Sequence, residues 1–548
     1  MTQRGRLSIL ASGTAVCLFA LGTGCEGGSN STASGGTTGG VASTSSQGGA
    51  DLGQGGYQVG VGGNPSGQGG ALPNQAGSSA ISAGGVQLTM NTAEAGSTGA
   101  LGGAGAAAGT AATTQPAPTV TVSLNPAETY QTLEGFGAAI AWYLSTVSGH
   151  TKGAELYQVL FGDLGLDILR MRNAFGRSEF TDAVREKKIL EAATASIGRR
   201  PKVLMSSWSP PAALKANGLE TCTGEATCTL KKTDGAYVYT EFANYWFDAV
   251  NAYRNVGLVP DWISIQNEPD FIPTGYEGCK FRATETAEFP GYGQALAAVA
   301  TKLNTMSDPP KLIGPELIGI HWQKMPTYMS ALDKSLLWAA AHHLYERGTD
   351  GICDWRTPGP DSYLAPMLEA KSAVGTLPVF QTEFATDDDN GTEGGFEVAW
   401  LIHNSLVEEG VSAWLYWDLV WGAGRGLVSV PDANSYSIRD QYYSVRHYAR
   451  YTDPGDVRIG ATASSAAVRV SAFRSPDQKR ITLIVLNTGT SEERISVAFG
   501  GFTAASSLVI RTVYVPGSSV RWETQAPIAQ GGVVVLPSRS VATVVLNG

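Results

Sequence analysis

The sequence predicts an α/β fold: a (β/α)₈ TIM barrel with an attached C-terminal β-sandwich side domain. Between residues 119 and 451, short apolar strands alternate with segments of helical periodicity, which is the pattern of parallel βαβ units. After residue 451 the chain changes to closely spaced short strands separated by Gly, Pro and Asn. We therefore expect the barrel at 119–455, including a leading strand of the side domain, and the β-sandwich at 456–548.

Residues 1–25 have the pattern of an export signal, because basic residues precede a short apolar segment at 7–21. That segment is short and interrupted by glycine, so a permanent membrane span is not expected. Its ending, LGTGC at 21–25, resembles a bacterial lipoprotein cleavage box, although Gly22 departs from the usual pattern. We expect an exported protein, either a cell-surface lipoprotein anchored through Cys25 or a secreted protein with an ordinary signal.

Residues 26–118 are expected to form a disordered linker. They consist mainly of Gly, Ser, Thr and Ala, and Tyr57 is their only aromatic residue. Such a segment cannot bury enough apolar surface to offset the entropy lost on ordering. The linker would hold the barrel away from a membrane surface.

Eight strand candidates, each a short run of apolar and β-branched residues, lie in the barrel region. They are 133–140, 168–172, 202–206, 262–266, 311–314, 338–342, 379–382 and 413–417. The longest helical candidates are 239–256, 285–306 and 395–409, with apolar residues at helical spacing. An open doubly wound sheet is the alternative, but no Gly-x-Gly-x-x-Gly turn follows an early strand.

The side domain is predicted from five short strands. They are 468–473, 480–486, 508–515, 533–536 and 541–546. The alternating segment 119–124 precedes the barrel and needs a sheet edge to pair with, so we expect it to join these strands.

Four cysteines lie beyond the export signal, an even number that allows three pairings. Cys222 and Cys228 flank a polar loop and are placed to form a local disulfide. Cys279 and Cys353 would then form the long-range pair. Zinc is the alternative, but the spacing fits no common zinc pattern and no histidine pair accompanies it.

Two predicted barrel strands end in a glutamate. The apolar run 262–265 stops before Pro269, which has no amide hydrogen to continue a strand, so Glu268 is left at the strand's C-terminal edge. Glu383 follows the strand at 379–382 in the same way. Catalytic groups of such barrels come from C-terminal strand ends, and glycoside hydrolysis needs two carboxyls. For either glutamate alone, a surface carboxylate or a structural ion pair is the alternative. This chemistry requires no metal and no organic cofactor.

Other side chains follow strands at the same end of the barrel. Arg170 or Arg172 would hydrogen-bond a carboxylate and keep it ionised. Trp208 lies on a loop with two prolines, a suitable platform for a sugar ring. Tyr345 offers a phenol that would orient a nucleophile, and Trp417 would form the floor of a pocket. Core packing is the alternative for any one of these aromatic residues.

Several motifs together resemble glycoside hydrolase family 30, nearest to the bacterial glucuronoxylan and glucuronoarabinoxylan endo-β-1,4-xylanases. They are Gly135-Phe136-Gly137, the Trp208 loop, Ile265 to Asp270, His343-Leu344-Tyr345, Thr382-Glu383 and Asp453 to Ala461. The likeness runs from about residue 119 to 548. It implies a retaining mechanism with Glu268 as the acid/base and Glu383 as the nucleophile. It also implies substrate-binding positions at Trp142, Arg170, Trp208, Asn267, Tyr345 and Trp417.

One stretch departs from the xylanase pattern. In glucuronoxylanases the last barrel strand leads into a Trp-Tyr-x-Arg-Arg-like loop that binds the glucuronic acid branch. Here residues 416–425 read YWDLVWGAGR, so the arginines are absent from that register. Arg425 comes later and is expected to be a solvated loop residue. A strict requirement for the acidic branch is therefore not predicted.

The resulting hypothesis is retaining hydrolysis of a plant cell-wall polysaccharide, by an endo-β-1,4-xylanase acting on glucuronoxylan or arabinoxylan. The alternatives are a family 30 β-1,6-glucanase, an exo-β-glycosidase, and a surface-tethered polysaccharide-binding protein without catalysis. The intact glutamate pair argues against the last. A formal charge of −10 argues against a nucleic-acid partner, because phosphate binding needs clustered Lys and Arg. We expect a monomer that contacts a membrane only through the lipid anchor at Cys25.

Overall fold

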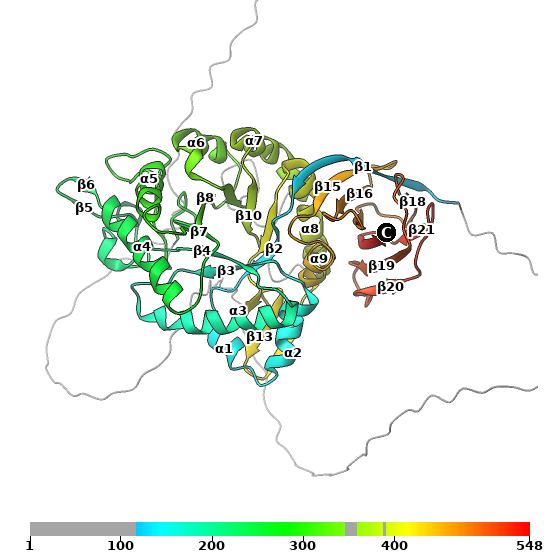
Figure 1. The fold of residues 1–548 in the computed structure, drawn as a ribbon, viewed down its shortest axis with the longest axis horizontal. Coiled ribbons are helices and arrows are strands. Elements are labelled where there is room, and N and C mark those ends of the chain that lie inside the picture. The colour runs from blue at the N-terminus through cyan, green and yellow to red at the C-terminus, as the bar shows by residue number, and fades with distance from the viewer. Residues whose placement is uncertain (1–116, 274, 346–358, 387–390) are drawn as a thin grey trace, which may run out of the picture. The chain divides into compact units, whose positions relative to one another are not determined.

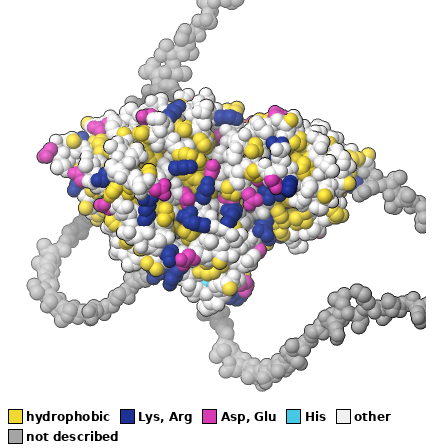
Figure 2. Space-filling view, viewed as in Figure 1, with side chains coloured by type: hydrophobic (Ala, Val, Ile, Leu, Met, Phe, Trp, Pro, Cys, Tyr) yellow, Lys and Arg dark blue, Asp and Glu magenta, His cyan; other side chains and the backbone are white. Residues whose placement is uncertain are grey.

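The structure, a computed structural model, describes residues 117–273, 275–345, 359–386 and 391–548 (Figure 1). The export signal with Cys25, nearly all of the linker, and Cys353 lie outside these residues. No helix in the described part of the chain is long and apolar enough to cross a membrane. On the face drawn in Figure 2, acidic side chains lie between the lysines and arginines.

Eight parallel strands close into a barrel in the order β10-β11-β2-β3-β4-β7-β8-β9. They are β2 (Gly135–Ala139), β3 (Ile168–Arg172), β4 (Lys202–Ser206), β7 (Trp262–Ser264), β8 (Lys311–Leu317), β9 (Ala339–His343), β10 (Val379–Glu383) and β11 (Ala413–Tyr416). Each coincides with one of the eight expected strands, and the predicted fold class is confirmed. Apolar side chains of these strands, such as Leu204, Ile313 and Phe380, form a buried cluster of their own, as the filled interior of such a barrel requires.

Helices connect the strands, and Figure 1 shows α3 to α7 outside the ring of strands. They are α1 (Leu144–Ser148), α2 (Gly153–Tyr157), α3 (Ala183–Ile197), α4 (Tyr239–Asn255), α5 (Tyr292–Leu303), α6 (Lys324–Ala331), α7 (Leu364–Val374), α8 (Gly391–Asn404) and α9 (Asp440–Ala449). The expected helix 239–256 coincides with α4. The expected helix 285–306 is wrong in its first turns, because α5 begins only at Tyr292. Pro290 disfavours helical backbone at the residue before it and explains the late start.

The side domain is a nine-stranded sheet in the order β20-β19-β22-β17-β16-β15-β1-β18-β21. Its strands are β1 (Val120–Thr132), β15 (Val457–Ala463), β16 (Val468–Arg474), β17 (Arg480–Asn487), β18 (Glu493–Ala498), β19 (Ser506–Val513), β20 (Glu523–Gln525), β21 (Val533–Leu536) and β22 (Ser540–Asn547). The segment 119–124, expected to join this domain, overlaps β1. That strand pairs antiparallel with β15 and parallel with β18 (Figure 1).

Strand β1 has the period of two that its sequence predicts. Val120, Val122 and Leu124 are buried in the apolar core of the side domain, whereas Thr121 and Ser123 are exposed. Strand β1 therefore belongs to the side domain, although the other strands of that domain lie at the C-terminal end of the chain.

Hydrogen bonds join the last barrel helix to the side domain. The imidazole of His447, on α9, lies 2.8 Å from the hydroxyl oxygens of Thr512 and Thr543, on β19 and β22. The hydroxyls of Ser444 and Tyr514 lie 2.6 Å apart. All of these side chains are buried. Barrel and side domain thus share a buried polar contact.

Candidate active site

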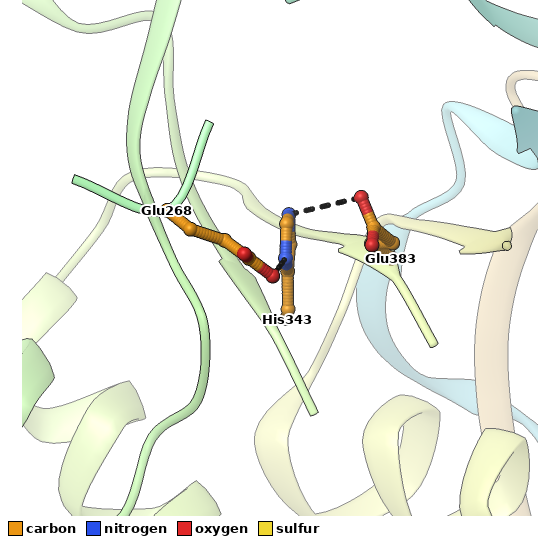
Figure 3. Close-up of side chains that lie close together, drawn as sticks. All are labelled: Glu268, His343 and Glu383. Carbon is orange, nitrogen blue, oxygen red and sulfur yellow. Dashed lines mark hydrogen bonds and ion pairs between the residues drawn. The ribbon is translucent and has the colours of Figure 1, made fainter. Parts of the chain in front are cut away.

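The two strand-end glutamates lie on either side of one histidine (Figure 3). Glu268 follows β7, Glu383 is the last residue of β10, and His343 is the last residue of β9. His343 Nδ1 lies 3.0 Å from Glu268 Oε1, and His343 Nε2 lies 3.9 Å from Glu383 Oε2. One oxygen of each carboxylate and one ring nitrogen all lie within 4.8 Å of one another. The barrel therefore brings together the two carboxyls that the sequence singled out.

The surroundings of Glu268 favour a protonated carboxyl. Its backbone has a φ of 46°, a left-handed conformation that ends the strand, and its N–H donates to the carbonyl of Glu316 at 3.0 Å. Burial raises the pKa of Glu268; the hydrogen bond from His343 opposes this rise, and the charge of Glu383 adds to it. A raised pKa shifts a carboxyl toward the protonated form that a general acid needs.

His343 is a buried cation. Burial alone would lower its pKa, but the charge of Glu383 and the hydrogen bonds to Glu268 and Glu316 raise the pKa of His343 to about 9. The ring is thus protonated at neutral pH and donates its Nδ1–H to Glu268. The glutamates and the histidine are near enough to hold one metal ion, and the imidazole would have to lose this proton to ligate it.

Glu383 is held in place by two donors. Arg170 Nη1 donates to Glu383 Oε2, and the Tyr345 hydroxyl donates to Glu383 Oε1 at 2.9 Å. Arg170 is fully buried on β3; it also donates from Nη2 to Asn267 and from Nε to Glu316. Hydrogen bonds to the charged form of a carboxyl favour that form. The arrangement suits a carboxylate that attacks carbon.

Sequence reasoning missed Glu316, the second-last residue of β8. It is fully buried, with a φ of 61°, and it lies 3.0 Å from Arg170 Nε. Burial acts to raise its pKa, but the charges of Arg170 and His343 lower the pKa of Glu316 to about 2. Glu316 is therefore an anion that balances two buried cations. Its strand-end position was the signal available in the sequence.

Three of the tryptophans expected to bind substrate pack against one another beside Arg170. The ring centroids of Trp142 and Trp208 lie 5.2 Å apart, those of Trp142 and Trp417 5.3 Å, and those of Trp208 and Trp417 5.6 Å. The Trp208 ring lies 4.5 Å from the guanidinium carbon of Arg170. These indoles form an aromatic wall next to the residue that holds Glu383.

Arg172 does not contact either candidate catalytic carboxyl. Its Nη1 donates to Glu277 at 2.6 Å, and its guanidinium carbon lies 5.2 Å from the Trp142 ring. Of the two arginines that the sequence offered, Arg170 is the one that contacts a candidate catalytic carboxylate, Glu383. Arg425 is exposed on the loop after β11, as expected.

Cys222 and Cys228 lie in the segment between β4 and α4, and Cys279 lies in the segment between β7 and α5. Cys222 and Cys228 form a disulfide. Cys279 is buried, and the N–H of the residue before it, Gly278, donates to the carbonyl of Glu220. Cys353, the partner expected for Cys279, lies outside the described residues.

Fold and site together define a glycoside hydrolase: a (β/α)₈ barrel with a β-sandwich and two strand-end carboxyls at its mouth. Residues 455–544 match the family model described as "Glycosyl hydrolase family 30 beta sandwich domain". The predicted resemblance to glycoside hydrolase family 30 is confirmed.

Known proteins with similar sequences cover most of the chain. The glucuronoxylanase XynC of Bacillus subtilis is 24% identical over 448 residues, 78% of this chain and 92% of that protein. The endo-1,6-beta-D-glucanase neg1 of Aspergillus fumigatus is 27% identical over 462 residues, 74% and 86% of the two chains. The catalytic domain of xylanase C from Talaromyces cellulolyticus superposes with a TM-score of 0.63 at 22% identity, covering 78% of this chain and all of that one. The last likeness bears on the fold alone.

Proposed function

We propose that the protein is a retaining endo-β-1,4-xylanase that acts on plant cell-wall xylan. The observation that carries the retaining mechanism is the distance between the carboxyls: oxygens of Glu268 and Glu383 lie within 4.8 Å of each other. Retaining glycosidases hold their two carboxyls about 5 to 5.5 Å apart, whereas inverting ones leave about 6.5 to 9.5 Å for a water molecule.

The surroundings of the two glutamates support a division of roles between them. Glu268, with its raised pKa, protonates the leaving glycosidic oxygen. Glu383, oriented by Arg170 and Tyr345, attacks the anomeric carbon and forms a glycosyl-enzyme. Glu268 then takes a proton from the water that hydrolyses this intermediate. Asn267 and the wall of Trp142, Trp208 and Trp417 bind the sugar at the reacting centre.

Xylan as the substrate rests on the likeness to the glucuronoxylanase of Bacillus subtilis. The arginines of the glucuronoxylanase pattern are missing from their register in the stretch 416–425, so we propose that an acidic branch is not required. The likeness to the Aspergillus fumigatus protein makes β-1,6-glucan the second candidate substrate. Both are neutral β-linked polymers that the same pair of carboxyls would cleave.

Glu383→Ala tests the mechanism. Without the nucleophile, turnover should fall by at least about 10⁴-fold, because no glycosyl-enzyme can form. Glu191→Ala is the matched control, since Glu191 is 59% exposed on α3. Reducing-sugar release from glucuronoxylan, arabinoxylan and β-1,6-glucan would be measured, with the anomer first formed followed by NMR. Near wild-type turnover of Glu383→Ala, or an inverted first product, contradicts the assignment.

We further propose that the protein is exported and held at the cell surface through Cys25. The signal pattern at 1–25 and the Gly/Ser/Thr/Ala-rich linker support this proposal. Incorporation of a labelled fatty acid into the wild type, and its loss in Cys25→Ser, would be measured in a bacterial host. Equal labelling of both proteins contradicts the anchor.

A further inference from the structure

Trp322 is an exposed aromatic residue at the catalytic end of the barrel. It lies between β8 and α6, and therefore at the C-terminal ends of the strands, where Glu268 and Glu383 also lie. Its side chain is 40% exposed, and no other tryptophan in the described ranges is exposed to that degree. A large apolar ring left in water at the mouth of a site calls for an explanation.

The loop that carries Trp322 is fastened to the loop that carries the acid/base. Asp270, two residues after Glu268, accepts a hydrogen bond from the Ile318 N–H at 3.0 Å. Its other oxygen lies 2.8 Å from Lys324 Nζ, which in turn lies 5.6 Å from the Trp322 ring centroid. The indole is thus tied to the Glu268 side of the site.

The backbone holds the indole outward. Trp322 and Gln323 have φ values of 54° and 56°, two consecutive non-glycine residues in the left-handed region. Each costs about 1 kcal/mol or more, and such strain is concentrated at functional sites. The preceding residue, His321, is buried and packs its ring 5.1 Å from the Tyr363 ring. His321 therefore anchors the loop in the interior, while Trp322 faces solvent.

We propose that Trp322 is a stacking platform for a pyranose ring of the substrate on the leaving-group side of the scissile bond. The proposal rests on the proposed function, in which Glu268 protonates the leaving oxygen. The part of the polysaccharide beyond that oxygen must lie on the Glu268 side, where Trp322 is fastened. The ligand is a neutral β-linked sugar unit, whose apolar C–H face packs on an indole. This subsite is separate from the wall formed by Trp142, Trp208 and Trp417.

Trp322→Ala tests the platform with two substrates of different reach. Unbranched xylohexaose extends to both sides of the cleaved bond, whereas β-xylobiosyl fluoride has a single atom as its leaving group. We expect the loss in kcat/KM for xylohexaose to exceed the loss for the fluoride by about tenfold, the factor that corresponds to 1.4 kcal/mol. Trp322→Tyr should restore most of the difference. Tyr130→Ala, at a 44% exposed aromatic residue of the side domain, is the matched control and should not discriminate between the substrates.

A transfer assay checks the side on which the platform lies. The glycosyl-enzyme formed from the fluoride divides between water and added xylobiose, and the acceptor binds on the leaving-group side. Trp322→Ala should lower the ratio of transfer to hydrolysis by a similar factor. Equal losses on both substrates with an unchanged transfer ratio overturn the platform but leave the proposed function standing. A wild-type protein that cleaves neither substrate overturns both.

Discussion

His343 lies close to three carboxylates that come from three different strand ends. It donates to Glu268, and its other nitrogen lies 3.8 Å from Glu316 and 3.9 Å from Glu383. Its positive charge offsets part of the repulsion between these carboxylates, which a dry pocket would otherwise make large. His343 is therefore a positioning residue that sets the proton affinity of Glu268.

The variant His343→Gln tests this role through the pH profile. Glu268 works as an acid only while protonated, so activity falls as pH rises through its pKa. Because His343 lowers the pKa of Glu268, removing its charge should raise that pKa and move the alkaline limb of kcat/KM to higher pH, while kcat also falls.

The control for this prediction is His403→Gln. His403 is also buried, but burial and nearby arginines lower its pKa to about 3, so it is neutral. Its replacement removes no charge at neutral pH and should leave the alkaline limb in place. An unmoved or lowered limb in His343→Gln contradicts the role assigned to His343.

The residues predictable from the sequence were those with a local signature. Glu268 and Glu383 each follow an apolar strand directly, and the prolines near Glu268 and Trp208 mark where strands give way to loops. Glu316 also lies near a strand end, but its importance arises from Arg170, which lies 146 positions earlier in the chain. Ion pairs between residues so far apart in sequence form only when the barrel closes, so neighbouring residues in the sequence do not predict them.

At the level of elements, β1 should contribute strongly to stability because it is an interior strand of the side sheet. Val122→Asp would bury a charge without a partner in that core, and we expect it to lower the free energy of unfolding by about 3 kcal/mol or more. Ser123→Asp is the matched control, since Ser123 is exposed one position along. Denaturant titration would compare the two. Equal losses would show that β1 does not belong to the folded core.

Element boundaries were predictable where a short buried run has clear ends and less so elsewhere. The strands at 168–172 and 202–206 agree with β3 and β4 residue for residue. The strand expected at 262–266 ends at Ser264, because the chain must turn before the left-handed Glu268. Strand β18 was not predicted, because its residues are half exposed and polar at alternate positions, and only pairing with β1 and β21 defines it.

For the molecule as a whole, the contact between barrel and side domain should be sensitive to acid. Burial, with the charge of Arg446, lowers the pKa of His447 to about 3, whereas an unfolded histidine titrates near 6.5. Because the folded pKa is the lower one, the stability from the neutral ring is complete above pH 6.5 and is lost as the pH falls toward 3. At pH 4.5 the loss is at most about 3 kcal/mol.

His447→Gln should flatten this dependence, since glutamine can still hydrogen-bond Thr512 and Thr543 but does not titrate. The free energy of unfolding would be measured from pH 7.5 to 4.5 by urea titration. We expect the variant to be less stable than the wild type at pH 7.5 and to lose less on acidification. Parallel curves for the two proteins would contradict the role of His447.

The pairing of β1 also constrains how the protein is synthesised. The Thr121 N–H donates to Ser464 Oγ, a residue 343 positions later, at 2.9 Å. Domains fold as they leave the ribosome, N-terminal parts first, but β1 has no partner until almost the whole chain has been translated. During that interval its apolar face, with Val120 and Val122, must be shielded by other means, and a chain that terminates early leaves a barrel with an unpaired strand attached.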